Sequence, residues 1–328
     1  MEYSIHMIIK NDIELNDTLK RLYGRLKQQV FKQELSNRGL VFIYGNDKLK
    51  DIYTFSLPAG WSCPGAEACL SKADPIKGGV KDGPRCQFRC FAASEESRLT
   101  VVRQIRWHNF NLLRKCSTVR EMARLICDSL PKDAKTVRVH HSGDFFSQDY
   151  FAAWLDVAWA NPNIIFYAYT KSIPTLLKFR NSIPSNFRIT ASMGSKYDDL
   201  ILANNLNRSV VVKNEAEAVA LGLEIDDDDS HALAGDASFA LLVHAAQPAG
   251  TSWAKAWEAI RQATVQANKL APKKATRPPV TTAQWIDRIF RMVARLIKAG
   301  GQLNQEDAAL VGALSITVGV LPSPVMVA

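Results

Sequence analysis

Four of the six cysteines lie close together in the chain, and such a group could bind a metal. They are Cys63, Cys69, Cys86 and Cys90, with five, sixteen and three residues between neighbours. Glycine and proline residues between and beside them allow the backbone to turn tightly around a common centre. Thiolates on loops of this kind bind zinc or iron–sulfur clusters. We therefore expect these four side chains to hold a metal.

The spacing of the four cysteines does not decide which metal they hold. It matches neither the two-residue spacing of zinc-binding repeats nor the usual ferredoxin pattern. An iron–sulfur cluster is the first expectation, and zinc is the alternative. Without a metal, the same thiols would form two disulfides or be four unrelated side chains. Disulfides are rare in the cytosol, which favours the metal.

Asp144, Lys171 and His244 are further candidates, because each ends or follows a run rich in β-branched and aromatic residues. The carboxyl ends of parallel strands meet at one edge of a sheet, where the active sites of such folds lie. We expect the three side chains to line one pocket as acid–base or anion-holding groups, with Lys171 lowering the pKa of Asp144. The alternatives are a turn or helix-cap aspartate, a solvated lysine and a core histidine.

A predicted helix that follows the cysteines carries a basic face with one aromatic residue: Arg98, Arg103, Arg106 and Trp107. Such a face suits phosphate contact and base stacking. The chain has 41 Lys and Arg against 32 Asp and Glu, a net charge of +9. This excess suits a polyanionic partner, either nucleic acid or a nucleotide. A helix face held by salt bridges is the alternative.

The elements that must position these residues alternate between strand and helix in the middle of the chain. The β-rich runs are residues 136–141, 163–170, 186–193, 208–212 and 238–244, and the helical segments between them are 149–160, 173–181, 198–205 and 215–221. This alternation predicts an α/β protein with parallel strands. We favour a partial or irregular (β/α) barrel over a doubly wound sheet.

Helices are also expected near both ends of the chain and beside the cysteines. Their ranges are 14–36, 94–115, Thr118 to the residue before Pro131, 253–268 and 283–300, and a hairpin of strands 40–44 and 51–56 leads to the first cysteine. Four regions follow: an N-terminal helix and hairpin (1–60), the cysteine cluster and basic helices (61–134), the (β/α) core (135–250) and a C-terminal helical extension (251–328) with a Pro-rich linker at 271–282.

The composition is typical of a folded soluble protein, with 47% hydrophobic and 22% charged residues. The first residues, MEYSIHMIIKND, lack the apolar core and cleavage site of a signal peptide. The longest apolar run, residues 308–321, is too short to cross a bilayer. We expect a cytoplasmic protein with no membrane partner, and the sequence does not indicate its oligomeric state.

The motifs TFSLPAGWSCPGAEAC, FRCFAASEE, HHSGDFF and YTK together resemble the gene product 88 family of phage and plasmid proteins, over residues 40–250. The resemblance implies an origin in a mobile element, and hence the cytosol of a host cell, but no particular reaction. In the family pattern, the match of Cys63, Cys69 and Cys90 is stronger than the match of Cys86.

Two other groups of proteins share parts of this pattern. The layout resembles radical S-adenosylmethionine enzymes, in which a cysteine-bound iron–sulfur cluster precedes a partial (β/α) barrel, and it implies S-adenosylmethionine as a further cofactor. The cysteine spacing here differs from theirs. Tyr167 and Lys171 resemble the nucleophile motif of rolling-circle replication initiators and nickases, with His140 and His141 nearby.

The leading interpretation is a phage- or plasmid-type metalloprotein whose cysteine-ligated site acts on nucleic acid or a nucleotide. One alternative is a rolling-circle-type nickase. Another is a non-enzymatic nucleic-acid-binding protein with structural zinc. The sequence leaves open whether the protein is an enzyme, and it gives neither the substrate nor the reaction.

Overall fold

The computed structural model describes residues 12–45, 49–270 and 278–317. The chain divides into two compact units, one of residues 39–272 and the other of residues 1–38 together with 273–328. The larger unit contains the cysteines and the strand-end residues, so it is the unit that positions the candidate site.

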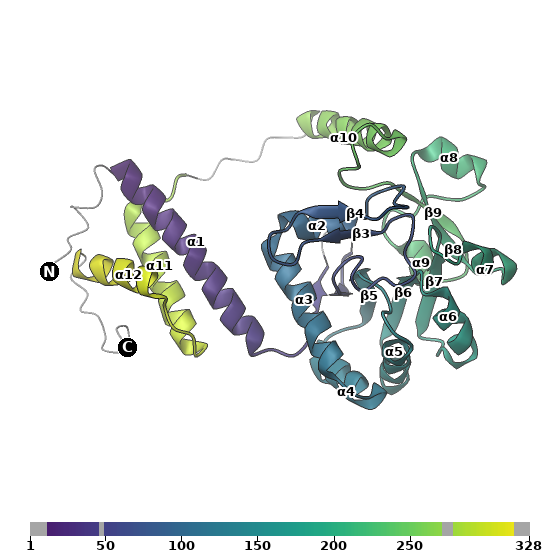
Figure 1. Cartoon of the computed structure of the whole chain (residues 1–328), viewed down its shortest axis with the longest axis horizontal. Helices are drawn as coiled ribbons and strands as arrows, with labels where there is room; N and C mark the ends of the chain where they lie inside the picture. The colour runs from purple at the N-terminus through teal and green to yellow at the C-terminus, as the bar shows by residue number, and fades with distance from the viewer. Residues whose placement is uncertain (1–11, 46–48, 271–277, 318–328) are drawn as a thin grey trace. The chain divides into compact units, whose positions relative to one another are not determined.

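The larger unit is built on one sheet in which the strands follow each other almost in chain order (Figure 1). The order is β1-β2-β5-β6-β7-β8-β9; β1 is antiparallel to β2, and every later pair is parallel. The strands are β1 (Ile43–Tyr44), β2 (Ile52–Ser56), β5 (Thr136–Ser142), β6 (Ile165–Thr170), β7 (Phe187–Ser192), β8 (Arg208–Val212) and β9 (Phe239–Leu242). A separate two-stranded sheet pairs β3 (Ser71–Ala73) with β4 (Val80–Asp82).

Helices connect these parallel strands, as short right-handed crossovers require. They are α2 (Phe91–Arg98), α3 (Thr100–Lys115), α4 (Val119–Ser129), α5 (Gln148–Ala160), α6 (Ile173–Phe179), α7 (Asp198–Ala203), α8 (Glu215–Ala220) and α9 (Ser230–Ala234), with a 3-10 turn at Arg180–Ser182. A further helix of this unit, α10 (Ser252–Leu270), follows the last strand. Side chains point to alternate faces of each strand, so the two faces of the sheet carry different residues.

One face of the sheet holds the main hydrophobic core. Val137 and Val139 of β5 and Phe166 of β6 are fully buried there against Trp154 and Phe151 of α5. The neighbouring residue of β6, Tyr167, faces the other way, into a smaller cluster with residues of β9 and α9. Burying large apolar side chains of this kind contributes about 1.5–3 kcal/mol each, so the main core fixes the register of the strands.

Most of the predicted elements are confirmed, but β3, β4 and α9 were not predicted, and two predictions need correction. The described strands form an open sheet with β1 and β9 at its edges, so the structure confirms an α/β fold with a mostly parallel sheet but does not show a barrel. The helix predicted over 94–115 is two helices, α2 and α3, because Leu99 between them is extended (φ −111°, ψ 95°). That break turns the basic face of α3 relative to α2.

The smaller unit is helical and joins segments from both ends of the chain. Its helices are α1 (Asp12–Ser36), α11 (Thr282–Lys298) and α12 (Gln305–Thr317). Leu22 and Leu26 of α1 pack on Ile289 and Val293 of α11. Buried Asp307 at the start of α12 accepts hydrogen bonds of 2.7 Å from both Arg25 and Gln29 of α1.

The two units divide the chain differently from the four regions expected. The hairpin assigned to the N-terminal region belongs to the sheet, because β2 pairs with β5, and α1 packs on α11 of the C-terminal extension. Residues 46–48 of the predicted hairpin, residues 271–277 of the linker and the residues beyond 317 lie outside the described residues. None of the described helices is long and apolar enough to cross a bilayer.

Candidate functional site

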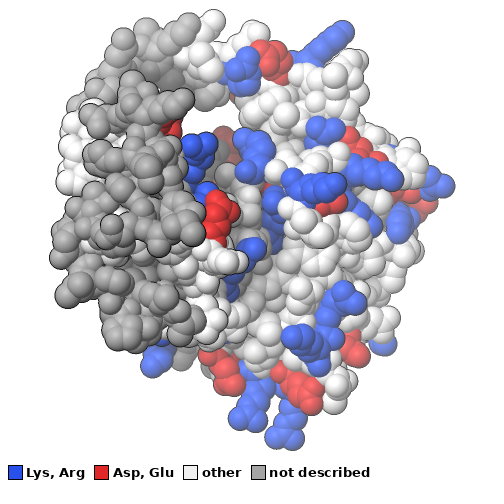
Figure 2. Space-filling model, turned by 60° about the vertical axis from the view of Figure 1, so that its left-hand side comes forward, with Lys and Arg blue, Asp and Glu red and all other residues white. Residues whose placement is uncertain are grey.

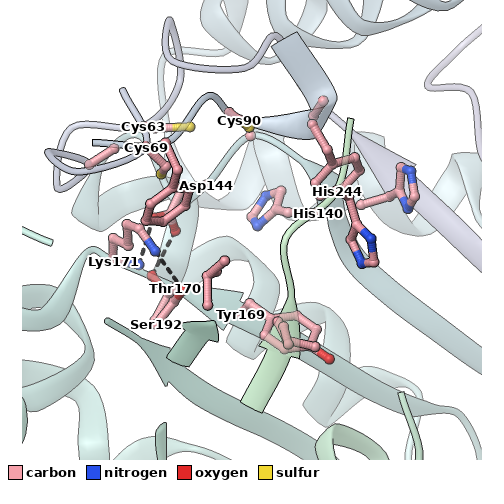
Figure 3. Close-up of a pocket in the computed structure, with 18 of the residues that line it drawn as sticks. Cys63, Cys69, Cys90, His140, Asp144, Tyr169, Thr170, Lys171, Ser192 and His244 are labelled. Atoms are coloured by element: carbon pink, nitrogen blue, oxygen red, sulfur yellow. Dashed lines mark hydrogen bonds between the residues drawn. The ribbon is translucent and has the colours of Figure 1, made fainter. Parts of the chain in front are cut away.

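A cavity of about 180 Å³ lies at the carboxyl ends of the parallel strands, between the sheet and the cysteine-rich loops (Figure 3). Its wall brings together side chains that are far apart in the sequence. The polar and sulfur-bearing residues that line it include Cys63, Cys69, Arg89, Cys90, Arg138, His140, His141, Asp144, Tyr169, Thr170, Lys171, Ser192 and His244. The cavity therefore unites the three strand-end candidates with three of the four candidate cysteines.

Two glycines allow the cysteine loop to approach the strand ends this closely. A Cβ on Gly143, just after β5, would lie 2.6 Å from both Leu57 Cβ and Ser62 Oγ. A Cβ on Gly65 would lie 2.0 Å from the carbonyl oxygen of Lys171. Gly143 also has a φ of 90°, a conformation that favours glycine. These glycines place Cys63 against the ends of β5 and β6.

Asp144 joins the ends of β5 and β6. Its Oδ1 accepts hydrogen bonds from the backbone N–H of Phe145 (2.7 Å) and the hydroxyl of Thr170 (2.6 Å), and its Oδ2 accepts one from the N–H of Lys171 (2.8 Å). Burial raises its pKa to about 6 although these bonds lower it. Lys171 lowers the pKa of Asp144, as expected, but desolvation is the larger effect, so the net result is a raised pKa.

Lys171 lies in the same wall and is 8% exposed. Its Nζ donates hydrogen bonds to the hydroxyl of Ser192 (2.5 Å) and to the carbonyl oxygen of Met193 (2.8 Å), both at the end of β7. This lysine is not the solvated helix-start residue considered from the sequence. It is a buried ammonium group that lines the cavity.

Three histidines lie along the other side of the cavity. His244 follows β9, and its ring is 6.3 Å from the ring of Phe91, edge to face. His140 is buried, with Nε2 3.0 Å from the hydroxyl of Tyr150. Burial lowers the pKa of His140 and of His141 to about 3, and the charge of Arg138 lowers that of His141 further. Both imidazoles are therefore neutral at pH 7.

The structure separates the four cysteines into three and one. Cys63, Cys69 and Cys90 line the cavity, whereas Cys86 is not among the lining residues; its Sγ is 3.2 Å from the carbonyl oxygen of Phe88. All six cysteines of the chain are thiols, so the disulfide alternative does not hold. Within the described residues, no three His, Cys, Asp or Glu side chains are grouped so that they could hold a single metal ion.

Backbone N–H groups point toward two of the cavity thiols. The N–H of Gly60 donates to Cys63 Sγ at 3.3 Å, and the N–H groups of Ala92 and Ala93, at the start of α2, favour the thiolate of Cys90. Burial nevertheless raises the pKa of Cys63 well above its usual value and that of Cys90 to about 12. Without a nearby cation these two thiols are therefore protonated.

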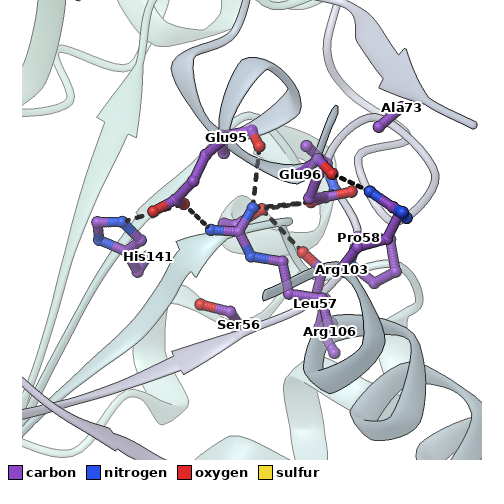
Figure 4. Close-up of polar contacts among 12 residues, drawn as sticks. Ser56, Leu57, Pro58, Ala73, Glu95, Glu96, Arg103, Arg106 and His141 are labelled. Carbon is purple, nitrogen blue, oxygen red and sulfur yellow. Dashed lines mark hydrogen bonds and ion pairs between the residues drawn. The ribbon is translucent and has the colours of Figure 1, made fainter. Parts of the chain in front are cut away.

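A buried ion-pair network holds the cysteine loops against β5 (Figure 4). Glu96 is fully buried, and its Oε1 accepts hydrogen bonds from the N–H of Ala59 (2.8 Å), from Arg106 Nη1 (2.9 Å) and from the hydroxyl of Ser142 (3.2 Å). Arg106 also pairs with Glu95. Because Ala59 precedes Cys63 and α2 begins after Cys90, this network fixes both loops.

The basic helix does not present its arginines to a nucleic acid. Arg103 and Arg106 are 5% and 2% exposed, and both donate to protein oxygens; Arg103 Nε reaches the carbonyl of Pro75 at 3.2 Å. Trp107 is half-buried and packs against Trp61. Arg98 alone of the four candidates is exposed. On the surface shown in Figure 2, Lys and Arg side chains are interspersed with Asp and Glu.

Tyr167 is placed unlike a nickase nucleophile. It is fully buried in β6, and its hydroxyl donates to Asp229 Oδ2 at 2.8 Å. A nucleophile that attacks DNA must reach the strand, so this geometry gives no support to that alternative. Arg138 pairs with the same carboxylate at 2.7 Å.

Two residues that the sequence reasoning did not single out are central to the geometry, Glu96 and Arg138. The sequence could have indicated Arg138, because it is a charged residue between Val137 and Val139 in a strand that is otherwise apolar up to its histidines. No sequence feature indicated Glu96, because an acid in the first turns of a helix is ordinarily a solvated residue.

Comparison with known proteins identifies the family. A family model described as "Gene product 88" matches residues 19–268, more than half of the chain. The "Gene 88 protein" of Mycobacterium phage L5 is 31% identical over 137 residues, and that of phage D29 is 30% identical over 137 residues. Each alignment covers 39% of this chain and 51% or 50% of the relative, so the chain spans about half the length of the curated relatives it matches.

No solved structure matches the chain. The comparisons also give no support to the layout of radical S-adenosylmethionine enzymes, since the family and both relatives are gene 88 proteins. The residues that the family model matches include the motifs around Cys63 and Asp144. The chain belongs to the gene product 88 family.

Proposed function

We propose that this protein is a phage- or plasmid-type metalloprotein in which Cys63, Cys69 and Cys90 hold an iron–sulfur cluster beside a substrate cavity, where it acts on a nucleotide or nucleic acid. One observation carries the proposal: three thiols from two loops line the same cavity as Asp144 and Lys171. A hydrophobic core does not require such a group of side chains. The site of action would be the cytoplasm of the host cell.

A cluster suits these thiols better than a single zinc ion. Structural zinc takes four ligands around one ion, but Cys86 does not line the cavity with the other three, and among the described residues no three such side chains are grouped around a single ion position. Around a cluster each thiolate binds a different iron, so the sulfurs stand further apart than around one ion. The N–H groups directed at Cys63 and Cys90 are of the kind that tune cluster sulfurs.

The strand order supports the placement of the active edge. It follows the chain from β2 to β9 without reversal, which is the order of a (β/α) barrel, whereas a doubly wound sheet reverses its order at the ligand site. We infer a partial (β/α) barrel, open between its edge strands. In that architecture the residues after each strand form the site.

The cavity residues have distinct capacities. A bound cluster would supply electron transfer or a Lewis-acidic iron. Lys171 can hold an anionic group, because it is a buried ammonium without a carboxylate within 4.0 Å among the described residues. Asp144 can hold or release a proton near neutral pH, since its pKa is about 6.

The test is anaerobic purification followed by analysis of iron, acid-labile sulfide and zinc. We expect iron with sulfide in the wild type and its loss in Cys63→Ser, Cys69→Ser and Cys90→Ser. Cys116→Ser is the matched control, because Cys116 is a partly buried thiol on another helix end. Zinc without sulfide would favour the non-enzymatic zinc protein, and retention of iron in all three variants would exclude the proposed ligands.

A further inference from the structure

We propose that Arg138, His140 and His141, which form the floor of the cavity, bind a phosphate group, and that the substrate is a phosphate monoester such as a nucleotide. The inference rests on the proposed function, because it takes this cavity as the substrate site. It concerns side chains of β5 and none of the proposed cluster ligands, so it can be tested without iron.

Each of these three residues has one buried nitrogen that no protein group bonds: Arg138 Nε, His140 Nδ1 and His141 Nδ1. His140 is 4% exposed. Native proteins leave few buried polar atoms without a partner. Such atoms also occur elsewhere in the described residues, as at Arg106 Nε and Glu96 Oε2, but these three share the wall of one cavity, which indicates that a ligand supplies their partners. The Nε of arginine can only donate. What binds there must therefore carry acceptor atoms.

The charges around the floor favour an anionic acceptor. Arg138 forms an ion pair with Asp229 at 2.7 Å. That carboxylate also accepts hydrogen bonds from the hydroxyls of Tyr167 (2.8 Å) and Tyr169 (3.1 Å). Lys171 uses two of its three ammonium protons on Ser192 and Met193. Arg138 and Lys171 therefore leave positive charge and unused donors in the cavity.

The histidines can complete the donor set. Both are neutral, because burial lowers their pKa values to about 3. The hydroxyl of Tyr150 can donate to Nε2 of His140, which leaves the imidazole proton on Nδ1. The Nε2 of His141 is 4.0 Å from Glu95, too far for a hydrogen bond, so its proton can also be on Nδ1.

The number of donors favours phosphate over carboxylate. Arg138, His140, His141 and Lys171 supply up to four donors from the ends of two strands. A phosphate monoester has three terminal oxygens in a pyramidal arrangement, whereas a carboxylate has two in one plane. The cavity volume of about 180 Å³ is below the roughly 300–1,000 Å³ of pockets that enclose drug-sized ligands. It suits a phosphate with its neighbouring atoms rather than a nucleic-acid strand.

The experiment is isothermal titration calorimetry of the full-length protein with inorganic phosphate, a deoxynucleoside 5′-monophosphate and acetate. We expect the nucleotide to bind more tightly than phosphate, and acetate to bind least. Arg138→Lys keeps a positive charge for Asp229 but removes Nε–H, so it should weaken nucleotide binding about 10- to 100-fold. Arg124→Gln is the control, because Arg124 is an exposed residue of α4. Thermal unfolding checks that both variants fold.

Three results would overturn the inference. Unchanged nucleotide binding in folded Arg138→Lys would exclude the floor as the site. Acetate binding as tightly as phosphate would indicate a carboxylate ligand, and no binding by the wild type would indicate that water fills the floor. Cys63→Ser distinguishes this inference from the cluster proposal. If the protein binds phosphate without iron, phosphate binding at the floor is supported even if the cluster proposal fails. If the wild type contains iron but does not bind phosphate, only the phosphate inference is refuted.

Discussion

Two neighbouring groups of polar residues in the larger unit use the same side-chain types in opposite ways. In the Glu95–Glu96–Arg106 network, Arg106 donates to both acids and to the carbonyl of Ala92. On the cavity floor, Arg138 has one carboxylate partner, Asp229. The Nε of each arginine is without a hydrogen-bond partner, but only that of Arg138 belongs to a residue that lines the cavity. The first arginine holds two loops in place, and we propose that the second binds a ligand.

This difference shows that residue type alone does not separate a structural charge from a functional one. Arg106 was a candidate nucleic-acid ligand on its sequence, and Arg138 was not a candidate at all. What distinguishes them is which groups face them after folding. The comparison predicts that mutations in the network act mainly on stability and mutations at the cavity mainly on binding.

The largest effect is expected for Arg106→Met. It leaves the fully buried carboxylate of Glu96 without its ion-pair partner. Breaking a buried pair in this way costs about 3–5 kcal/mol. Urea unfolding should show this loss, whereas Arg124→Met, which removes the exposed i,i+4 pair with Asp128, should cost about 0.3–0.5 kcal/mol. A loss below about 1 kcal/mol for Arg106→Met would contradict a structural role for the network.

The next effect concerns Asp144 and the pH dependence of stability. Its pKa is raised from 3.8 to about 6, so between these values the folded protein holds a proton that the unfolded chain has lost. The stabilisation from this proton is fully present below about pH 4 and is lost as the pH rises through about 6, on the order of 3 kcal/mol in all.

The measurement compares the unfolding free energies of wild type and Asp144→Asn across that pH range. The variant lacks the titrating group, so the difference between the two isolates this residue from all others. The stability of the wild type should fall relative to that of the variant as the pH rises. A constant difference would mean that Asp144 stays ionised in the folded protein, as the sequence led us to expect from Lys171.

Much of this fold could be predicted because the strands are short β-branched runs that alternate with helical segments. The shared pocket of Asp144 and Lys171 also follows from local sequence, since the carboxyl ends of parallel strands meet at one edge. Whether the sheet closes into a barrel cannot be predicted from the sequence, because closure depends on whether β9 pairs with β1, and no local pattern specifies that pairing.

The parts that could not be predicted depend on contacts between distant segments. The helical pattern after Cys90 does not show that the chain is extended at Leu99 or that Arg106 turns toward Glu96. The packing of α1 on α11 joins residues more than 200 positions apart. Such pairings are set by the packing of the whole unit, so neither spacing nor composition reports them.

A smaller effect is expected at the exposed end of the basic helices. If the protein binds single-stranded nucleic acid, Arg98→Gln should reduce the slope of log affinity against log salt by about 0.7, the contribution of one phosphate contact. Arg98 is exposed, whereas Arg103 is bound to protein oxygens. Fluorescence anisotropy over a range of salt concentrations measures the slope. A folded Arg103→Gln variant that lowers the slope equally would show that Arg103 contacts phosphate despite its burial.

The smallest effect is expected for Cys86→Ser, and it tests whether three or four cysteines form the site. Cys86 donates to the carbonyl of Phe88 at 3.2 Å and lies 3.5 Å from the hydroxyl of Ser71. A serine hydroxyl can make the same bond, so the stability should change by less than about 1 kcal/mol. Because Cys86 does not line the cavity, iron content should also match the wild type, whereas Cys90→Ser should lose iron. Equal loss of iron in both variants would place Cys86 among the ligands, and the structural division of the cysteines into three and one would then not describe the metal-bound protein.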